Sequence, residues 1–431
     1  MIKLAVIADD LTGSNDTGVQ FAKFGMRVFV LLDRTMEAPP DIDVVVVNTD
    51  SRSLPAAEAR GNVRAACRWL RKRGVRQAIK KVDSTLRGNL GAEIEEAMIE
   101  LECDAAVIAP AFPRIGRITA GGYYLLGQRP VSETEMARDP KAPVTESRLA
   151  AVIQSQAASN VAQVELDALL QGREAVVASI LQCLDRGDRL ITFDATTEEH
   201  LALIAGAAVA TGRRVLWAGS AGLAEVLPAA LSWSPTAGVP ATPEVREPVL
   251  IVAGSISSVT ARQLDCLRSL RDVKTVRFDA VAALGDGERT LRECCREASH
   301  WLTAGDDVVL EIGDRSPDAV AEAVAVGATQ GLAPGAVSDA IADRLSELTV
   351  RLARRRCGAL VLTGGDTAVA ICRRLQAAGI LIIREIAPGV PLGCLAGGQL
   401  DGLPVVTKAG AFGEDDVFVR ALAILKKEKE I

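Results

Sequence analysis

The chain has few of the residues on which several common kinds of site depend. Only two histidines occur among 431 residues, His200 and His300, and both fall within or beside segments expected to be helical. The nine cysteines include no Cys-x-x-Cys pair and follow no regular spacing. These gaps argue against histidine-based catalysis, a zinc site and a disulfide framework, and they indicate a reduced, cytoplasmic compartment.

The chain also lacks an excess of positive charge and long apolar runs. The formal net charge of -6 repels a phosphate backbone, so no nucleic-acid partner is expected. The longest charge-free stretch, near residues 201–212, is shorter than the ~20 apolar residues of a membrane helix. Asp9 and Asp10 come too early for a secretory signal. We therefore expect no membrane association.

Two well-known phosphate-binding sequences are also absent. No Gly-x-x-x-x-Gly-Lys-Ser/Thr sequence is present, and the turn after the first predicted strand lacks Gly-x-Gly-x-x-Gly. Any nucleotide site in this chain must therefore be of another type.

What the chain does contain is an alternation of apolar, strand-length runs with segments of helical period. This alternation is typical of parallel sheets covered by helices. Strands are predicted at residues 4–8, 28–32, 44–47, 78–82, 105–109, 190–193 and 215–217, and then at 249–253, 308–312, 359–362, 380–386 and 405–408. A chain of 431 residues usually forms more than one core. The predicted fold class is α/β, with two domains that are each a largely parallel sheet flanked by helices.

Two irregular stretches divide this pattern. Prolines cluster between residues 228 and 248, which predicts an N-terminal domain at 1–230, a linker at 231–248 and a C-terminal domain at 249–431. Residues 111–147 are rich in glycine, proline and polar residues, and we expect them to form a functional loop that overhangs a site.

In the second half, residues 363–367 read as a glycine turn between a strand and the start of a helix. Such a turn presents unpaired N–H groups and the positive end of the helix, and its glycines allow a phosphate to come close. A nucleotide phosphate fits this turn, although a plain tight turn would also explain it.

Two more strand ends in this half carry similar residues. Ser255 follows one strand and is a candidate ligand, whereas Ser257 or Ser258 could simply cap the next helix. Lys408 and Gly410 follow another strand, and the alternative for Lys408 is a solvated surface position. Because the carboxyl ends of parallel strands meet at one edge of a sheet, the three turns together favour a nucleotide site.

The first half carries a different chemistry at its strand ends. Carboxylates and hydroxyls crowd residues 9–18, which we expect to be a loop, with Asp9 the aspartate most readily explained as structural. Aspartates accept hydrogen bonds from sugar hydroxyls, and an arginine fork matches a carboxylate or a phosphate. The set suits a small polyhydroxylated acid, unless Arg52 and Arg87 serve only as ion-pair partners of Asp50 or Asp83. The candidate substrate-binding residues are Asp10, Asp50, Arg52, Lys81, Asp83, Ser84 and Arg87.

Phosphoryl transfer depends mainly on positioning and charge stabilisation, and an aspartate can accept the proton of the attacking hydroxyl. Asp10 and Asp83 are both candidates for this catalytic role, and the sequence leaves the choice between them open.

Residues 8–13, 83–89, 109–113 and 363–367 together resemble the motifs of the four-carbon acid sugar kinases, and the resemblance spans nearly the whole chain. It implies an N-terminal acid-sugar domain, a C-terminal ATP domain, and phosphorylation of the terminal hydroxyl of threonate, erythronate or 3-oxotetronate. Residues 111–147 also resemble the family's substrate-side loop, in which Arg117 and Thr134 are candidate contacts. The ATP-binding positions implied by the resemblance are Ser255, Gly364, Gly365, Asp366, Thr367 and Gly410.

One position departs from the family pattern. Asp366 stands where many members carry glutamate, which keeps the carboxylate but shortens its reach. We expect Mg²⁺ to accompany ATP and assign it no protein ligand.

The kinase hypothesis has two rivals of other kinds. One is a non-catalytic, two-lobed sugar-acid sensor, and the other is a kinase for sugar phosphates or dinucleotides, against which the aspartates of the first half argue. Within the family, a 3-oxotetronate kinase is the alternative to a D-threonate or D-erythronate kinase. The expected partners are therefore a sugar acid and ATP, and the oligomeric state is left open, with a homodimer as one option.

Overall fold

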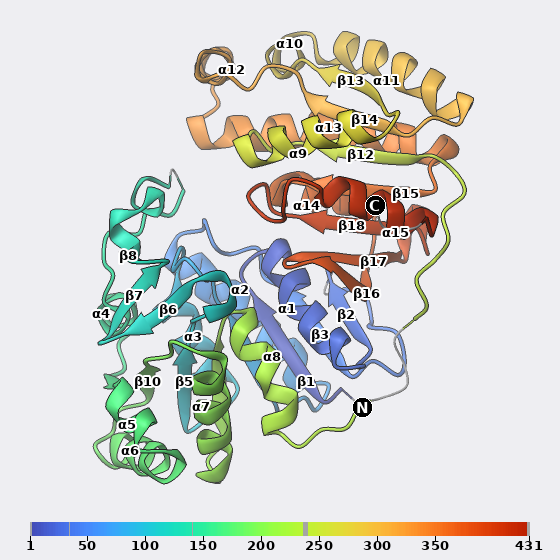
Figure 1. The fold of residues 1–431 in the computed structure, drawn as a ribbon. Coiled ribbons are helices and arrows are strands. Elements are labelled where there is room, and N and C mark those ends of the chain that lie inside the picture. Colours follow the sequence, from blue (N-terminus) through green and yellow to red (C-terminus); the bar gives the residue numbers. More distant parts are fainter. Residues whose placement is uncertain (1, 34, 140, 236–239, 429–431) are drawn as a thin grey trace. The chain divides into compact units, whose positions relative to one another are not determined.

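The computed structural model describes residues 2–33, 35–139, 141–235 and 240–428. The chain divides into two compact units, Met1–Arg34 with Ala38–Val239, and Thr35–Glu37 with Pro240–Ile431 (Figure 1). Each unit has a mostly parallel sheet with helices packed on it, which confirms the predicted fold class. The linker predicted at 231–248 includes residues 236–239, which lie outside the described part of the chain.

The sheet of the N-terminal unit has the strand order β2-β3-β1-β4-β11-β5-β10-β9, and its neighbouring strands run parallel. Strands β1 and β5 are apolar and buried on both faces, as expected of a sheet covered by helices on each side. The strands are β1 (Leu4–Ala8), β2 (Val28–Leu31), β3 (Val44–Asn48), β4 (Ala78–Lys81), β5 (Ala105–Ala109), β9 (Val161–Val164), β10 (Leu190–Phe193) and β11 (Val215–Gly219).

The helices of this unit are α1 (Leu11–Lys23), α2 (Ala56–Arg71), α3 (Leu90–Glu100), α4 (Leu149–Gln154), α5 (Leu166–Leu170), α6 (Arg173–Asp185), α7 (Glu198–Ala210) and α8 (Ala221–Ala230). The expectation of a loop over residues 9–18 was wrong, because α1 already begins at Leu11. Asp10 is its N-cap and accepts a hydrogen bond from Gly13 N at 2.9 Å. The polar residues that suggested a loop belong instead to the first turns of a buried helix.

The segment 111–147 is more regular than predicted. It contains a small antiparallel sheet of β6 (Arg117–Ala120), β7 (Tyr123–Leu126) and β8 (Arg129–Pro130), and the short 3-10 helices η1 (Pro113–Ile115), η2 (Val131–Glu133) and η3 (Glu135–Arg138). Gly121 and Gly122, both with positive φ, form the turn between β6 and β7. These glycines shape a hairpin turn rather than an irregular loop. The buried Tyr124 hydroxyl ties the small sheet to the main one by donating to Ser84 O and Pro110 O.

The C-terminal unit has the strand order β13-β14-β12-β15-β18-β17-β16. The first five are parallel, and β17 is antiparallel to both of its neighbours. The strands are β12 (Val249–Ala253), β13 (Lys274–Phe278), β14 (Val308–Ile312), β15 (Ala359–Thr363), β16 (Gly379–Ala387), β17 (Val390–Ala396) and β18 (Pro404–Lys408). The sequence reading missed β13 and β17, and the Pro388-Gly389 turn, with Gly389 at φ +74, was the available hairpin signal for β17.

The helices of this unit are α9 (Ser258–Leu270), α10 (Ala280–Gly285), α11 (Gly287–Ala304), α12 (Pro317–Thr329), α13 (Pro334–Arg356), α14 (Gly365–Arg374) and α15 (Val417–Lys426), with η4 (Gly398–Leu400) as a short 3-10 turn. Leucines of α9 and α15 share one buried cluster with β12, β15 and β18, so these two helices cover one face of the sheet. The loops that follow these strands lie at their carboxyl ends.

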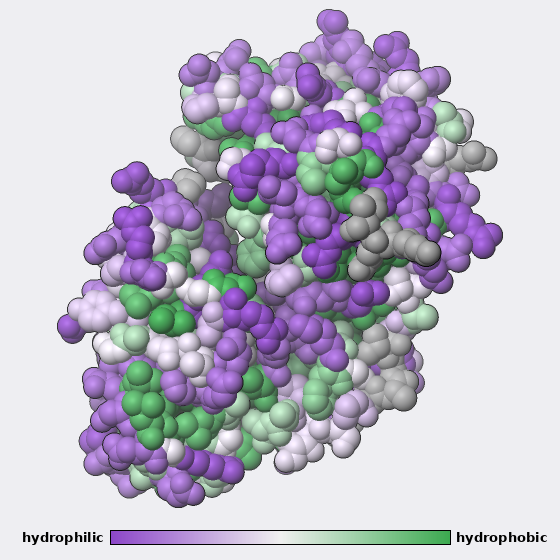
Figure 2. Space-filling view, in the orientation of Figure 1, coloured by the Kyte–Doolittle hydropathy of each residue, from purple (hydrophilic) through white to green (hydrophobic). Residues whose placement is uncertain are grey.

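Figure 2 shows mostly hydrophilic residues on the face in view, with hydrophobic residues in smaller groups. Over the described ranges, no helix has both the length and the apolar character needed to cross a membrane.

Candidate functional sites

The N-terminal unit gathers opposite charges where three neighbouring strands end. β1 lies between β3 and β4, so the loops after these strands share one edge of the sheet. Arg52 stands at the centre, with Nε 2.7 Å from Asp9 Oδ2 and Nη2 2.7 Å from Asp10 Oδ1. Its Nη1 lies 3.8 Å from Asp83 Oδ1. One guanidinium therefore lies within ion-pair distance of three carboxylates that come from two different loops.

These carboxylates differ in how far solvent reaches them. The Asp9 and Asp83 side chains are 5% and 9% exposed, whereas Asp10 is 23% exposed. Asp10 is therefore the member of the cluster that an incoming hydroxyl can reach most easily.

The same environment separates their proton affinities. Burial raises the pKa of Asp10, and the charges of Asp9 and Asp83 add to this effect against Arg52 and Lys81. Burial alone would also raise the pKa of Asp83, but Arg52 and Arg87 hold it well below its usual range. Burial would raise the pKa of Asp9 as well, but Arg52 together with Lys80 and Lys81 lowers it. Asp10 is thus the stronger base, and the other two remain ionised.

Arg87 forms a second charged group next to the first. Its Nε donates to Asp83 Oδ2 at 2.7 Å, and its Nη1 donates to Asp139 Oδ2 at 3.1 Å. The Thr85 hydroxyl also donates to Asp83 Oδ2. The ion pair between Arg87 and Asp83 that the sequence left as an alternative is therefore present, and Asp139 was missed because it lies far away in the chain.

The other predicted substrate residues fall in different places. Lys81 is buried at the end of β4 and donates to Val82 O at 2.8 Å, and the Ser84 hydroxyl accepts a hydrogen bond from Arg117 Nη1. Asp50 has a left-handed backbone (φ 48) and an exposed side chain in the loop after β3. Thr134 caps η3 and donates to Val131 O. The structure therefore brings Lys81 and Ser84 to the charged loops and gives Thr134 a capping role.

Beneath the charged cluster lies an ion pair that sequence reasoning did not find. Lys80 Nζ is 2.8 Å from Glu93 Oε2, and the two side chains are 1% and 2% exposed. The Ser51 hydroxyl donates to Glu93 Oε1 at 2.9 Å, which connects the pair to the loop that carries Arg52. Two consecutive lysines in a buried strand were the available signal, because their side chains point to opposite faces and each needs a partner.

In the C-terminal unit, the three predicted turns converge at the carboxyl ends of the adjacent strands β12, β15 and β18. The turns approach so closely that a Cβ atom added at Gly410 would collide with the side-chain oxygen Ser255 Oγ. A Cβ atom at Gly254 would collide with Thr367 Oγ1. Gly364 has φ +105, a conformation that favours glycine. The turns thus form one continuous surface at the N-terminus of α14.

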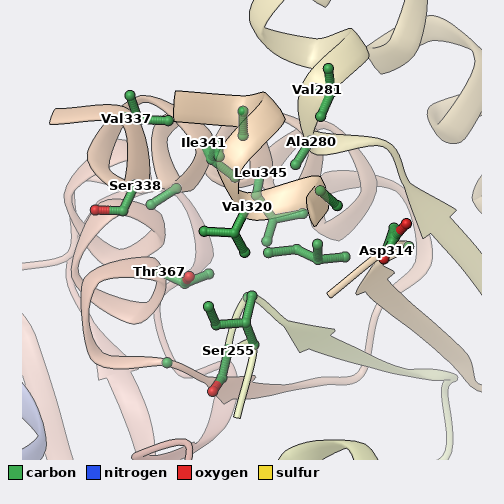
Figure 3. Close-up of a pocket in the computed structure, with 18 of the residues that line it drawn as sticks. Ser255, Ala280, Val281, Asp314, Val320, Val337, Ser338, Ile341, Leu345 and Thr367 are labelled. Carbon is green, nitrogen blue, oxygen red and sulfur yellow. The ribbon is translucent and has the colours of Figure 1, made fainter. Parts of the chain in front are cut away.

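This surface closes one side of a cavity of about 880 Å³. All six residues predicted to bind ATP line it: Ser255, Gly364, Gly365, Asp366, Thr367 and Gly410. In Figure 3, Ser255 and Thr367 lie on one side of the cavity, and Val281, Val337 and Ile341 lie on the other. The structure places the six residues together, and their contact with ATP stays a prediction.

The far wall of the cavity was not predicted. Apolar side chains of α12 and α13 form it, including Val320, Ile341 and Leu345. Arg277 and Asp314 line the cavity from the ends of β13 and β14. Ligands bind at the carboxyl ends of parallel strands, and this rule applied to the predicted strand β14 would have found Asp314. Arg277 could not be found in this way, because its strand β13 was not predicted. The cavity therefore offers an apolar compartment beside a polar surface rich in N–H groups, as a nucleotide requires.

The alternative that Lys408 is a solvated surface residue was wrong. Its side chain is among the largest that are fully buried, and only 2% of the residue is exposed. Desolvation by burial lowers the pKa of Lys408 from 10.5 to about 7. Ser257, in contrast, is the N-cap of α9, as its structural alternative predicted.

The contact between Gly410 and Ser255 leads to a prediction for Gly410→Ala. The added methyl group would force Ser255 away from the turn, and overpacking of this kind costs about 1–3 kcal/mol. We expect the KM for ATP to rise about tenfold or more, with the KM for the acid unchanged, in steady-state kinetics. Gly285→Ala, where the new methyl group meets open space in the same unit, is the control. Equal effects of both substitutions would contradict this role of the contact.

Taken together, the two sites define a class of protein: a two-domain α/β protein with a cluster of arginines and carboxylates in one unit and a cavity lined by glycine-bearing turns in the other. Comparison with known families agrees with this division. A family described as the sugar-binding N-terminal domain matches residues 4–227, and one described as the nucleotide-binding C-terminal domain matches residues 250–418.

Relatives match over nearly the full length. The chain is 37% identical to a D-threonate kinase of Salmonella typhimurium, covering 99% of both chains. It is 33% identical to a D-erythronate kinase of Heliobacterium modesticaldum, covering 96% of this chain and 95% of the relative. A solved Salmonella typhimurium LT2 protein, described as a candidate tRNA synthase, superposes with a TM-score of 0.82 at 29% identity, covering 98% of this chain and 99% of its own. The chain belongs to the family of four-carbon acid sugar kinases, which confirms the resemblance seen in its motifs.

Proposed function

We propose that this protein transfers the terminal phosphoryl group of ATP to the terminal hydroxyl of a four-carbon sugar acid, D-threonate or D-erythronate. The observation that carries the proposal is the separation of chemistry between the units. Arg52 and Arg87 with their aspartates suit a hydroxylated acid, and the turns around Gly364 suit a triphosphate. The D-threonate kinase of Salmonella typhimurium makes D-threonate the first substrate to test.

In the N-terminal unit, the proposed roles follow from charge and access. Asp10 is the general base, because it is the most exposed carboxylate of its cluster and burial raises its pKa. Arg52 keeps Asp10 oriented through hydrogen bonds of 2.7 and 3.0 Å. Arg87 and Lys81 supply the positive charge that recognises the carboxylate of the acid.

In the C-terminal unit, the phosphates of ATP lie against the turns after β12, β15 and β18, at the positive end of α14. The base occupies the apolar compartment between α12 and α13. Glycine at these turns keeps their shape for the phosphates: Gly364 has φ +105, and a Cβ atom at Gly410 would collide with Ser255 Oγ.

Magnesium fits this site as a companion of ATP. Within the described residues, no group of three or more His, Cys, Asp or Glu side chains could hold a metal ion. Mg²⁺ commonly binds through one or two carboxylates and the phosphates of its substrate. Asp366, which lines the cavity in the first turn of α14, would be the protein carboxylate. When bound, Mg²⁺ neutralises charge on the phosphates during transfer.

The setting of this reaction is also part of the proposal. All nine cysteines are free thiols in the structure, which supports a reducing, cytoplasmic compartment. The net charge of -6 gives no support to a role in binding tRNA.

The test is a coupled assay of ADP formation with Mg-ATP and a panel of acids: D-threonate, D-erythronate, L-threonate and 3-oxotetronate. We expect acid-dependent ADP formation with one of the first two, together with a phosphorylated acid seen by mass spectrometry. Acid binding without ADP formation would indicate a sensor and would refute the kinase. Turnover of 3-oxotetronate alone would assign the chain to that branch of the family.

A further inference from the structure

We propose that Lys408 is a positioning residue for the nucleotide phosphates, which joins the turns after β15 and β18 and supplies a positive charge behind them. This inference rests on the proposed function, since it concerns the way in which the same cavity receives ATP. Lys408 does not line the cavity itself and acts through the residues that do.

The geometry connects Lys408 to two of the phosphate-facing turns. Its Nζ donates to Thr363 Oγ1 and to Gly410 O, each at 3.2 Å. Thr363 is the last residue of β15 and directly precedes Gly364, and Gly410 lies against Ser255. One ammonium group therefore sets the relative position of two turns that contribute to the cavity surface.

A neighbouring side chain shows that this bridge does not require a charge. The buried Thr260 hydroxyl of α9 donates to the same Gly410 oxygen at 2.9 Å, and it is neutral. A neutral donor would therefore be enough to orient the turn. A lysine at this place carries a desolvation cost that a purely structural bridge does not explain.

The charge has no anionic partner within the described residues. Lys408 forms no ion pair there; its contacts are the two neutral oxygens and the Phe418 ring, whose centroid lies 5.4 Å from Nζ. The elements packed around it carry several charged residues, and none of them pairs with Lys408 within the described part of the chain. They are Asp366, Arg373 and Arg374 on α14, Arg262, Asp265 and Arg268 on α9, and Asp415, Asp416, Arg420 and Lys426 at and within α15. Arg262 and Asp415 pair with each other at 3.4 Å. The anion that best completes this environment is the triphosphate on the other side of the turns.

Proton uptake on binding follows from this arrangement. Desolvation lowers the pKa of Lys408 to about 7 in the free protein. A bound polyanion favours the charged form, so the pKa rises when the nucleotide binds. The affinity for ATP is then complete below pH 7 and falls as the pH increases above it, by up to about tenfold per pH unit.

The experiment measures ATP binding to the full-length wild-type protein by isothermal titration calorimetry between pH 7 and 9, in two buffers of different ionisation enthalpy. Phosphate groups lose their second proton near pH 6, so ATP itself contributes little in this range. We expect uptake of a fraction of a proton at pH 7 that increases toward one near pH 8.5. This measurement needs no variant and does not depend on the stability of one.

The variant Lys408→Met then tests whether Lys408 is the group that takes up the proton when ATP binds. We expect its ATP affinity at pH 7 to fall about tenfold or more and its pH dependence to disappear, whereas its melting temperature without ATP stays the same or rises. Lys274→Met, which removes a partly exposed lysine paired with Asp272 in the same unit, is the control and should behave like the wild type.

The outcomes separate the two proposals. No ATP binding by the wild type would refute the proposed function. ATP binding by the wild type without proton uptake, or with equal affinity and the same pH profile in Lys408→Met, would overturn the role of Lys408 and leave the kinase intact. A lower melting temperature of Lys408→Met with unchanged ATP affinity would assign Lys408 to structure alone.

Discussion

Replacing Asp10 by asparagine is expected to lower kcat by about 10²- to 10⁴-fold, the usual contribution of a positioned general base. Asparagine keeps the shape of the side chain and can still cap α1 and accept from Arg52. It cannot take the proton of the attacking hydroxyl. We therefore expect the KM for ATP to stay unchanged and the KM for the acid to change only a few-fold, in steady-state kinetics with D-threonate.

Two companion variants make this prediction specific. Asp167→Asn makes the same chemical change at an exposed position of α5 and should retain full activity. Asp83→Asn should instead raise the KM for the acid, because it leaves Arg87 without its carboxylate partner at 2.7 Å. A wild-type kcat in Asp10→Asn together with a large loss of kcat in Asp83→Asn would show that Asp83 is the base.

The pH profile follows from the same assignment. A base acts when it is ionised, so kcat/KM falls as the pH decreases through the pKa of Asp10. Burial raises this pKa above 3.8, and the acid limb therefore lies at higher pH than for an ordinary aspartate. We expect this limb in the kcat/KM profile of the wild type and its loss from the residual activity of Asp10→Asn. An unchanged acid limb in the variant would assign it to another group.

Lys80→Met is expected to destabilise the N-terminal unit by about 3–5 kcal/mol, the cost of leaving one member of a buried ion pair without its partner. Glu93 is 2% exposed, and burial raises its pKa even with Lys80 present. Removing Lys80 therefore leaves a carboxylate that must either stay charged without compensation or take up a proton. Urea unfolding, with hydrogen exchange at the β4 amides as the local probe, measures the effect.

The double variant and a surface variant are the controls. Lys80→Met combined with Glu93→Met should recover most of the lost stability, because no buried charge then remains. Arg71→Met removes one partner of an ion pair whose side chains are 45% and 63% exposed, and it should cost less than about 1 kcal/mol. A small effect of Lys80→Met by itself would show that water or another group compensates Glu93.

Much of the architecture was predictable because local signals agree with the fold. Apolar runs such as residues 4–8 and 105–109 became β1 and β5 with the predicted bounds. The predictions were less precise where the same residue type occurs in two kinds of structure. Gly121 and Gly122 predict a loop but form a hairpin turn, and the polar residues after Asp10 predict a loop but belong to a buried helix.

By itself, the sequence determined the α/β class, the family, and the strand ends at which the charged and glycine-rich turns occur, because these depend on residue order within short segments. The tertiary structure decided which groups meet. It paired Arg52 with Asp9 and Asp10, and it buried Lys408 behind the turns at Gly410. Arg52 and its two aspartates follow different strands, and Lys408 ends β18 whereas its partner Thr363 ends β15. The pKa of each group depends on desolvation and on charges brought close only by folding. The three-dimensional contacts thus support the proposals that Asp10 is the base and that Lys408 positions the phosphates.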